Sequence, residues 1–139
     1  VYEVWRFFFL RLSAHAIGFP TPHTAEYLEM PPPSAEEILA MLAARDALRG
    51  RLLAMMERVP FLLAPVMRCR PWKVGEFPGV DAMEPLTYAN LLGLPAVAVP
   101  VGVEEGMPVA WQLIGRPWEE EALLEVAAEV ERRRGTMER

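Results

Sequence analysis

Two valine-rich apolar runs, separated by a short polar segment with a glycine at each end, constrain the fold of this chain most strongly. The first run is Ala96–Val101, bounded by Pro95 and Gly102, and the second is Met107–Ile114. Short β-branched runs bounded by turn residues are typical of buried strands. Glycine supplies the positive φ that tight connections need. The pattern therefore predicts a β-hairpin, with residues 102–106 as a five-residue loop.

An amphipathic helix is expected after this hairpin, over Glu119–Arg134. Three glutamates open it and three arginines close it, which suits the helix dipole, and Gly135 can end it. The apolar face predicted from helical spacing consists of Leu123, Leu124, Ala127 and Val130. Gln112 is the single glutamine and falls in the second strand. If it is buried, its amide needs hydrogen-bond partners, which we expect to be backbone groups.

The amino-terminal half contains another clear helix, over Ser34–Arg58. The sequence Ser34-Ala35-Glu36-Glu37 is a capping box at its start. Gly50 lies inside this helix and indicates a kink or a close packing contact. Before it, Val1–Phe19 has partial helical periodicity; the predicted face consists of Val1, Val4, Trp5, Phe8 and Leu12.

A proline-rich connector ends at Pro33, and we expect the boundary between two parts of the chain there. We expect a helical and proline-rich lead-in over residues 1–33 and an α/β part over residues 34–139. The chain begins at Val1 rather than a methionine, which is compatible with a fragment, a proteolytic product or a damaged reading frame.

The literal string around the hairpin resembles the carboxyl-terminal signature of the amidase signature family, serine hydrolases that cleave amide bonds. The matching elements are Asn90-x-x-Gly93-Leu94-Pro95-Ala96, Val99-Pro100-x-Gly102, Gly106-x-Pro108-Val109, Gln112-Leu113-Ile114-Gly115-Arg116-Pro117 and Glu121-x-x-Leu124. One departure is Ala110-Trp111, where a glycine and a smaller apolar residue are frequent. The stretch Arg45–Tyr88 resembles the family more weakly. The resemblance implies an α/β fold: a partial mixed β-sheet with flanking helices, a fragment of the amidase signature fold.

The family's mechanism needs reactive groups that this chain does not carry in the family's arrangement. By the resemblance, these are a Ser nucleophile, a second Ser in a cis peptide, a neutral Lys as base and a Gly/Ser-rich oxyanion loop. The chain has one lysine, Lys73, and two serines, Ser13 and Ser34, neither in a glycine-rich loop. We therefore predict no catalytic residue here, and a carboxyl-terminal amidase part that is inactive alone.

The resemblance also suggests where a substrate would touch this chain. Met67–Glu84 is similar to a variable loop that lines the family's substrate pocket. It makes Trp72, Phe77 and Met83 candidates to contact the acyl group of a small amide substrate. The expected partner is the missing amino-terminal catalytic portion, or another copy of the chain by self-association.

Two other interpretations remain open. The chain could be a stand-alone, non-catalytic interaction or self-associating module, since its hydrophobic content of 53% suits a piece that needs more partner surface. It could also be a small α/β enzyme that uses Cys69, whose basic neighbours favour a thiolate. We expect ordinary surface or packing roles for the remaining candidates, which are His15, His23, Lys73, Asp81 and Glu84.

Composition excludes several classes of function. The net charge is −5 with no basic stripe, which argues against nucleic-acid binding. A single cysteine gives no disulfide framework and no zinc cluster, and we expect no cofactor. The single cysteine also fits a cytoplasmic setting, which we expect. No apolar run is long enough to cross a membrane. Thirteen arginines against one lysine, with 14 prolines, hint at a thermophilic source.

Overall fold

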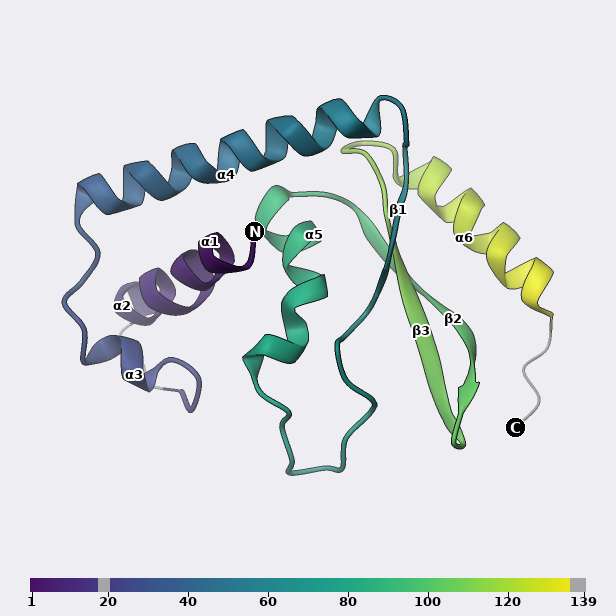
Figure 1. Cartoon of the computed structure of the whole chain (residues 1–139), viewed down its shortest axis with the longest axis horizontal. Helices are drawn as coiled ribbons and strands as arrows, with labels where there is room; N and C mark the ends of the chain where they lie inside the picture. The colour runs from purple at the N-terminus through teal and green to yellow at the C-terminus, as the bar shows by residue number, and fades with distance from the viewer. Residues whose placement is uncertain (18–20, 136–139) are drawn as a thin grey trace. The chain divides into compact units, whose positions relative to one another are not determined.

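The computed structural model describes residues 1–17 and 21–135. The chain forms two compact units, Val1–Leu52 and Leu53–Arg139, and each unit is described by itself (Figure 1). The division falls inside α4, Ala35–Met56. The boundary expected from sequence after residue 33 remains a prediction. No helix in the described ranges has both the length and the apolar character that a membrane span requires.

A three-stranded sheet forms the centre of the second unit. Its strands are β1 (Leu62–Pro65), β2 (Ala96–Glu104) and β3 (Met107–Ile114), in the order β1-β3-β2. Both neighbours of β3 run antiparallel to it, and β2 and β3 form the long hairpin in Figure 1. The predicted α/β class is confirmed, and every pairing among the described strands is antiparallel.

The hairpin is tighter than the sequence suggested. The predicted five-residue loop is wrong, because β2 continues to Glu104 and only Glu105 and Gly106 form the turn. Both turn residues have positive φ, 51° and 77°. Positive φ at both central residues is typical of the turn whose twist matches that of the two strands. The glycine at position 102 lies beside a bulge, where the register shifts between Pro100 and Gly102.

The predicted helix after the hairpin is confirmed as α6, Glu120–Arg134. It packs on one face of the sheet, where Leu123 and Ala127 meet Val99 and Leu113 in a buried cluster. Leu124 does not belong to this face, contrary to the prediction, because one residue further along a helix turns the side chain away from the sheet. Its exposed fraction is 57%, whereas that of Leu123 is 2%.

Gln112 finds backbone partners, as expected. Its side chain is 3% exposed. Nε2 donates to the Pro65 carbonyl at 3.2 Å and to the Pro85 carbonyl at 2.7 Å. Pro85 lies in the 3₁₀ helix η2 (Val80–Leu86), which leads into α5 (Thr87–Leu92). The amide thus joins β1, β3 and η2 at one point, and it satisfies the buried Pro85 carbonyl, which would be costly to leave without a donor.

The first unit consists of helices. They are α1 (Tyr2–Arg6), the π-helix η1 (Phe7–Leu12), α2 (Ser13–Ile17), α3 (Ala25–Leu28) and most of α4. The helical segment expected at the start is confirmed. Of its predicted face, Trp5 is buried, and Val1, Val4, Phe8 and Leu12 are half-buried. The buried side chains are Trp5, Phe7, Leu10 and Ala14. A π-helix has i→i+5 hydrogen bonds, so it shifts the phase of a pattern read with α-helical spacing.

Polar contacts fix the start of α4. The predicted capping box is present: the Glu37 N–H donates to Ser34 Oγ at 3.1 Å, and the Ser34 N–H donates to Glu37 Oε2 at 2.8 Å. Arg11 Nη1 lies 3.0 Å from Glu37 Oε1. The hydrogen bond from Ser34 and that from Arg11 hold the pKa of the Glu37 carboxyl below its usual value. Gly50 makes no close packing contact, because a Cβ there would meet nothing within 4 Å.

Candidate functional site

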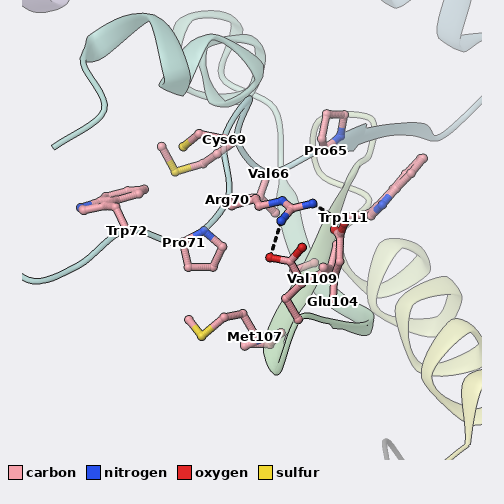
Figure 2. A pocket seen from close by; sticks show the side chains of 14 residues that line it. Pro65, Val66, Cys69, Arg70, Pro71, Trp72, Glu104, Met107, Val109 and Trp111 are labelled. Atoms are coloured by element: carbon pink, nitrogen blue, oxygen red, sulfur yellow. Dashed lines mark hydrogen bonds and ion pairs between the residues drawn. The ribbon is translucent and has the colours of Figure 1, made fainter. Parts of the chain in front are cut away.

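A pocket of about 450 Å³ lies within the second unit, between the segment that follows β1 and the tip of the β2–β3 hairpin (Figure 2). Its lining is mostly apolar. The residues that line it are Pro65, Val66, Met67, Cys69, Arg70, Pro71, Trp72, Glu104, Glu105, Met107, Pro108, Val109, Ala110 and Trp111. This size falls in the range of small-molecule sites, roughly 300–1,000 Å³.

An ion-pair cluster links the two sides of the pocket. Arg70 Nη2 lies 2.7 Å from Glu104 Oε1, and Arg70 Nη1 lies 2.5 Å from Glu105 Oε2. All three side chains are more than half exposed, so solvent screens the attraction and little stability follows. The cluster pairs both carboxylates of the lining with one guanidinium, so a net charge of −1 remains at the hairpin tip. The remaining surface, which includes Trp72, Pro71 and Met107 in Figure 2, suits an uncharged apolar group.

The structure brings two of the three predicted substrate-contacting residues together. Trp72 lines the pocket, and its ring lies 6.0 Å from that of Phe77 in an edge-to-face arrangement. Phe77 supports Trp72 but does not itself line the pocket. Met83 lies in η2, half-buried, and is likewise outside the described lining. Whether any of the three contacts a substrate stays a prediction.

Several lining residues escaped the sequence-based prediction. Met107 and Val109 were assigned to a strand alone, and the pairing of Arg70 with Glu104 spans 34 positions. No local pattern predicts such a contact, because it depends on where the hairpin tip lies relative to the end of β1. The resemblance directed attention to the loop over residues 67–84 and away from the hairpin opposite it.

Cys69 lies in this pocket, half-buried, but its surroundings do not favour a nucleophile. Its basic neighbours are engaged: Arg68 pairs with Glu84, and Arg70 pairs with Glu104 and Glu105. The described lining contains no histidine, and both of its carboxylates bond Arg70. A thiol without a free base beside it is not activated in the way that thiol enzymes require.

The two serines have structural roles. Ser13 Oγ donates to the Phe9 carbonyl at 2.6 Å, one turn earlier in the helix. Ser34 Oγ accepts the Glu37 N–H in the capping box. Lys73 lies exposed in the segment after the pocket. Among the residues that the structure describes, no group of three His, Cys, Asp or Glu side chains is placed to hold a metal ion.

Known proteins are similar to this chain in sequence and in fold. The model of the amidase family matches residues 23–124. The chain belongs to the amidase family. A solved amidase has a TM-score of 0.70 and 27% identity with this chain, over 89% of this chain and 31% of the solved one. A bacterial aryl acylamidase of the amidase signature family has a TM-score of 0.67 at 20% identity, over 85% and 27%, which bears on the fold alone.

Relatives of this chain carry several different names. The fatty acid amide hydrolase of Medicago truncatula is 58% identical over 52 residues, which are 37% of this chain and 9% of the plant protein. A glutamyl-tRNA(Gln) amidotransferase polypeptide of Cereibacter sphaeroides is 36% identical over 90 residues, which are 60% of this chain and 18% of the bacterial protein. The chain therefore matches only a small part of each relative's length.

Proposed function

We propose that this chain is the carboxyl-terminal part of an amide hydrolase and that it is inactive alone. The observation that carries the proposal is the family match over residues 23–124, together with the fold shared with an amidase of which it covers 31%. The hydroxyl of Ser13 bonds a helix carbonyl and that of Ser34 caps α4, which is consistent with a nucleophile on another part of the protein.

The reaction of the whole protein would follow the chemistry that the family implies. A serine attacks the amide carbonyl while its proton passes, through a second serine, to a neutral lysine. Backbone N–H groups stabilise the negatively charged oxygen of the tetrahedral intermediate. The C–N bond then breaks, the amine or ammonia leaves with a proton, and water releases the acid from the acyl-enzyme. None of these reactive groups is assigned to this chain.

The contribution of this chain would be one wall of the site that holds the acyl group. The apolar lining around Trp72 and Met107, with both of its carboxylates paired with Arg70, supports that role. Phe77 would fix the orientation of the Trp72 ring. Met83 is proposed as a further contact from η2. The substrate would be a small amide with an apolar acyl group.

A replacement experiment tests this function. In the solved amidase, the stretch matched by this chain is replaced by this chain, and hydrolysis of a small aryl or alkyl amide is measured. We expect the hybrid to hydrolyse the amide and the purified 139-residue chain to show no activity. Hydrolysis by the purified chain, or a hybrid that folds without activity, would contradict the proposal.

A second candidate function is a stand-alone, self-associating module. Large exposed apolar side chains favour it, among them Trp118, which is 91% exposed, and Leu63. Light scattering of the purified chain distinguishes the two: a concentration-dependent dimer supports the module, and a monomer contradicts it.

A cytoplasmic location and a thermophilic source are proposed from composition. A thermal midpoint above the range of mesophilic domains, about 45–65 °C, would support the latter.

A further inference from the structure

A long surface loop, Val66–Glu84, leaves the sheet at the end of β1 and returns through η2 (Figure 1). It carries one wall of the pocket as well as the three predicted substrate-contacting residues, Trp72, Phe77 and Met83. Residues 70–79 are all exposed, and Trp72 packs on Phe77 within the loop. A surface loop packed by its own side chains has the character of an Ω-loop, in which the two ends lie close together. Contacts at its ends therefore decide where this wall of the pocket lies.

Two contacts join the ends of this loop to each other. The Arg68 N–H donates to the Ala82 carbonyl at 2.9 Å. The Arg68 side chain pairs with Glu84, but it is 62% exposed, so solvent screens the attraction and little stability follows. These contacts close the loop. They do not fix its place beside the hairpin, because none of the three residues belongs to β2 or β3.

A buried amide on β3 ties the ends of the loop to the hairpin. Gln112 points to the sheet face opposite α6, because its neighbour Leu113 lies in the cluster under α6 and successive strand residues face opposite sides. Its Nε2 reaches the carbonyls of Pro65 and Pro85, which lie one residue before the loop and one residue after it. Pro85 belongs to η2, outside the sheet, so the 2.7 Å bond connects the returning end of the loop to a strand. At 3% exposure, the amide is shielded from competing water.

One strand therefore bears on both walls of the pocket. Met107, Val109 and Trp111 of β3 line one wall directly. Gln112, on the same strand, holds the base of the loop that forms the other wall. The ion pairs of Arg70 with the hairpin tip also link the walls, but these side chains are more than half exposed and their attraction is screened. The spacing of the walls thus depends chiefly on the buried amide.

We infer that Gln112 is a positioning residue that sets the width of the pocket and, through it, the size of the acyl group that the whole hydrolase accepts. The inference rests on the proposed function of the pocket. Gln112 is not among the residues that line the pocket, so it acts through the two walls rather than by touching the substrate. Without its amide, the returning end of the loop is no longer held to β3. The pocket then widens, and larger acyl groups fit.

The test uses the hybrid described above with Gln112→Met, a side chain of similar length that donates no hydrogen bond. The values of kcat and KM are measured for butanamide and for decanamide. We expect the ratio of kcat/KM for decanamide to that for butanamide to rise by about tenfold or more, since apolar pockets discriminate strongly by methylene count. The kcat for the better substrate should stay close to that of the parent hybrid, because the reactive groups lie elsewhere.

Leu123→Ala is the matched control in the same hybrid. It removes buried contacts from the other face of the same sheet, under α6, and so lowers stability without touching the base of the loop. We expect it to lower the melting temperature and to leave the ratio for the two amides unchanged. A shift as large as that of Gln112→Met would show that general loss of stability changes the ratio, and it would overturn the inference.

Hydrogen exchange of the isolated chain gives a second readout that does not depend on activity. In Gln112→Met, the Arg68 amide at the base of the loop should exchange about tenfold faster, whereas the amides between β2 and β3 keep their protection. If the Gln112→Met hybrid does not fold, an unchanged Arg68 amide in the isolated variant overturns the inference. An active Gln112→Met hybrid with the parent ratio also overturns it and leaves the proposed function intact. An inactive parent hybrid contradicts the proposed function itself.

Discussion

The two units of this chain are stabilised in different ways. In Leu53–Arg139, a single buried amide, Gln112, joins segments 47 and 27 positions away, and α6 seals an apolar cluster against the sheet. In Val1–Leu52, the specific long-range contacts are made by arginines: Arg6 donates to the Tyr27 hydroxyl at 2.8 Å, and Arg11 pairs with Glu37.

The difference shows which contacts can be removed with little loss of stability. A buried amide or leucine leaves an unsatisfied carbonyl or a cavity when it is removed, whereas a part-exposed charge regains water. We therefore expect substitutions in the second unit to have the larger effects on stability. Four predictions follow this contrast from the largest expected effect to the smallest.

Leu123→Ala should destabilise the second unit by about 2–5 kcal/mol, because it leaves a cavity between α6 and the sheet. Leu124→Ala is the matched control, since Leu124 is largely exposed, and it should change stability by less than about 1 kcal/mol. Denaturant unfolding followed by hydrogen exchange measures both. If α4 amides near Ser34 lose as much protection as those of β3, the two units unfold together and the contrast fails.

Gln112→Leu should destabilise the second unit by about 2 kcal/mol, because the buried Pro85 carbonyl and the part-buried Pro65 carbonyl lose their donor. Trp111→Leu, at the adjacent and partly exposed position, serves as the control and should have a smaller effect. Urea denaturation monitored by far-UV circular dichroism measures both variants. A Gln112→Leu protein as stable as the parent would show that water replaces the amide.

Ser34→Ala should destabilise the first unit by about 1 kcal/mol, the usual effect of removing a helix cap. The hydroxyl accepts the Glu37 N–H, which has no other partner within the first turn of α4. Ser13→Ala is a control in the same unit, because its hydroxyl bonds a carbonyl inside a helix. Equal losses in the two variants would show that capping has no special weight here.

The smallest effect concerns pH. Because the folded-state pKa of Glu37 is lowered, its charged form stabilises the first unit above the ordinary carboxyl value of 4.5. That contribution disappears as pH falls through the lowered pKa. Glu37→Gln should therefore lower the melting temperature at pH 7 and converge with the parent in acid. A Glu37→Gln protein whose melting temperature differs from that of the parent by the same amount at every pH would contradict the assignment.

Sequence succeeded where local chemistry decides the structure. The Ser34–Glu37 capping box, α6 with its acidic start and basic end, and the backbone partners of Gln112 were all predicted. The sequence-based prediction failed where a local change of helix type decides which residues are buried. The π-helical turn in η1 shifts the buried face to Phe7 and Leu10, and no residue pattern announces it.

Less of the candidate site than of the fold could be predicted from the sequence. The resemblance pointed to Trp72, which does line the pocket, but Arg70, Met107 and Val109 came from the structure alone. Their proximity depends on a hairpin tip reaching the end of β1. The length of that hairpin depends in turn on Glu105 adopting a positive φ, which a non-glycine residue rarely does.

The two-residue turn at Glu105-Gly106 also bears on the order in which the chain folds. A hairpin closed by such a turn needs only a short loop and forms within about 1–10 μs in isolated systems. β1 must then join β3 across 47 positions between Pro65 and Gln112, which is entropically slower. We expect the hairpin to serve as the folding nucleus and β1 to dock late, so substitutions at Gly106 should slow folding while those at Leu63 chiefly change the unfolding rate.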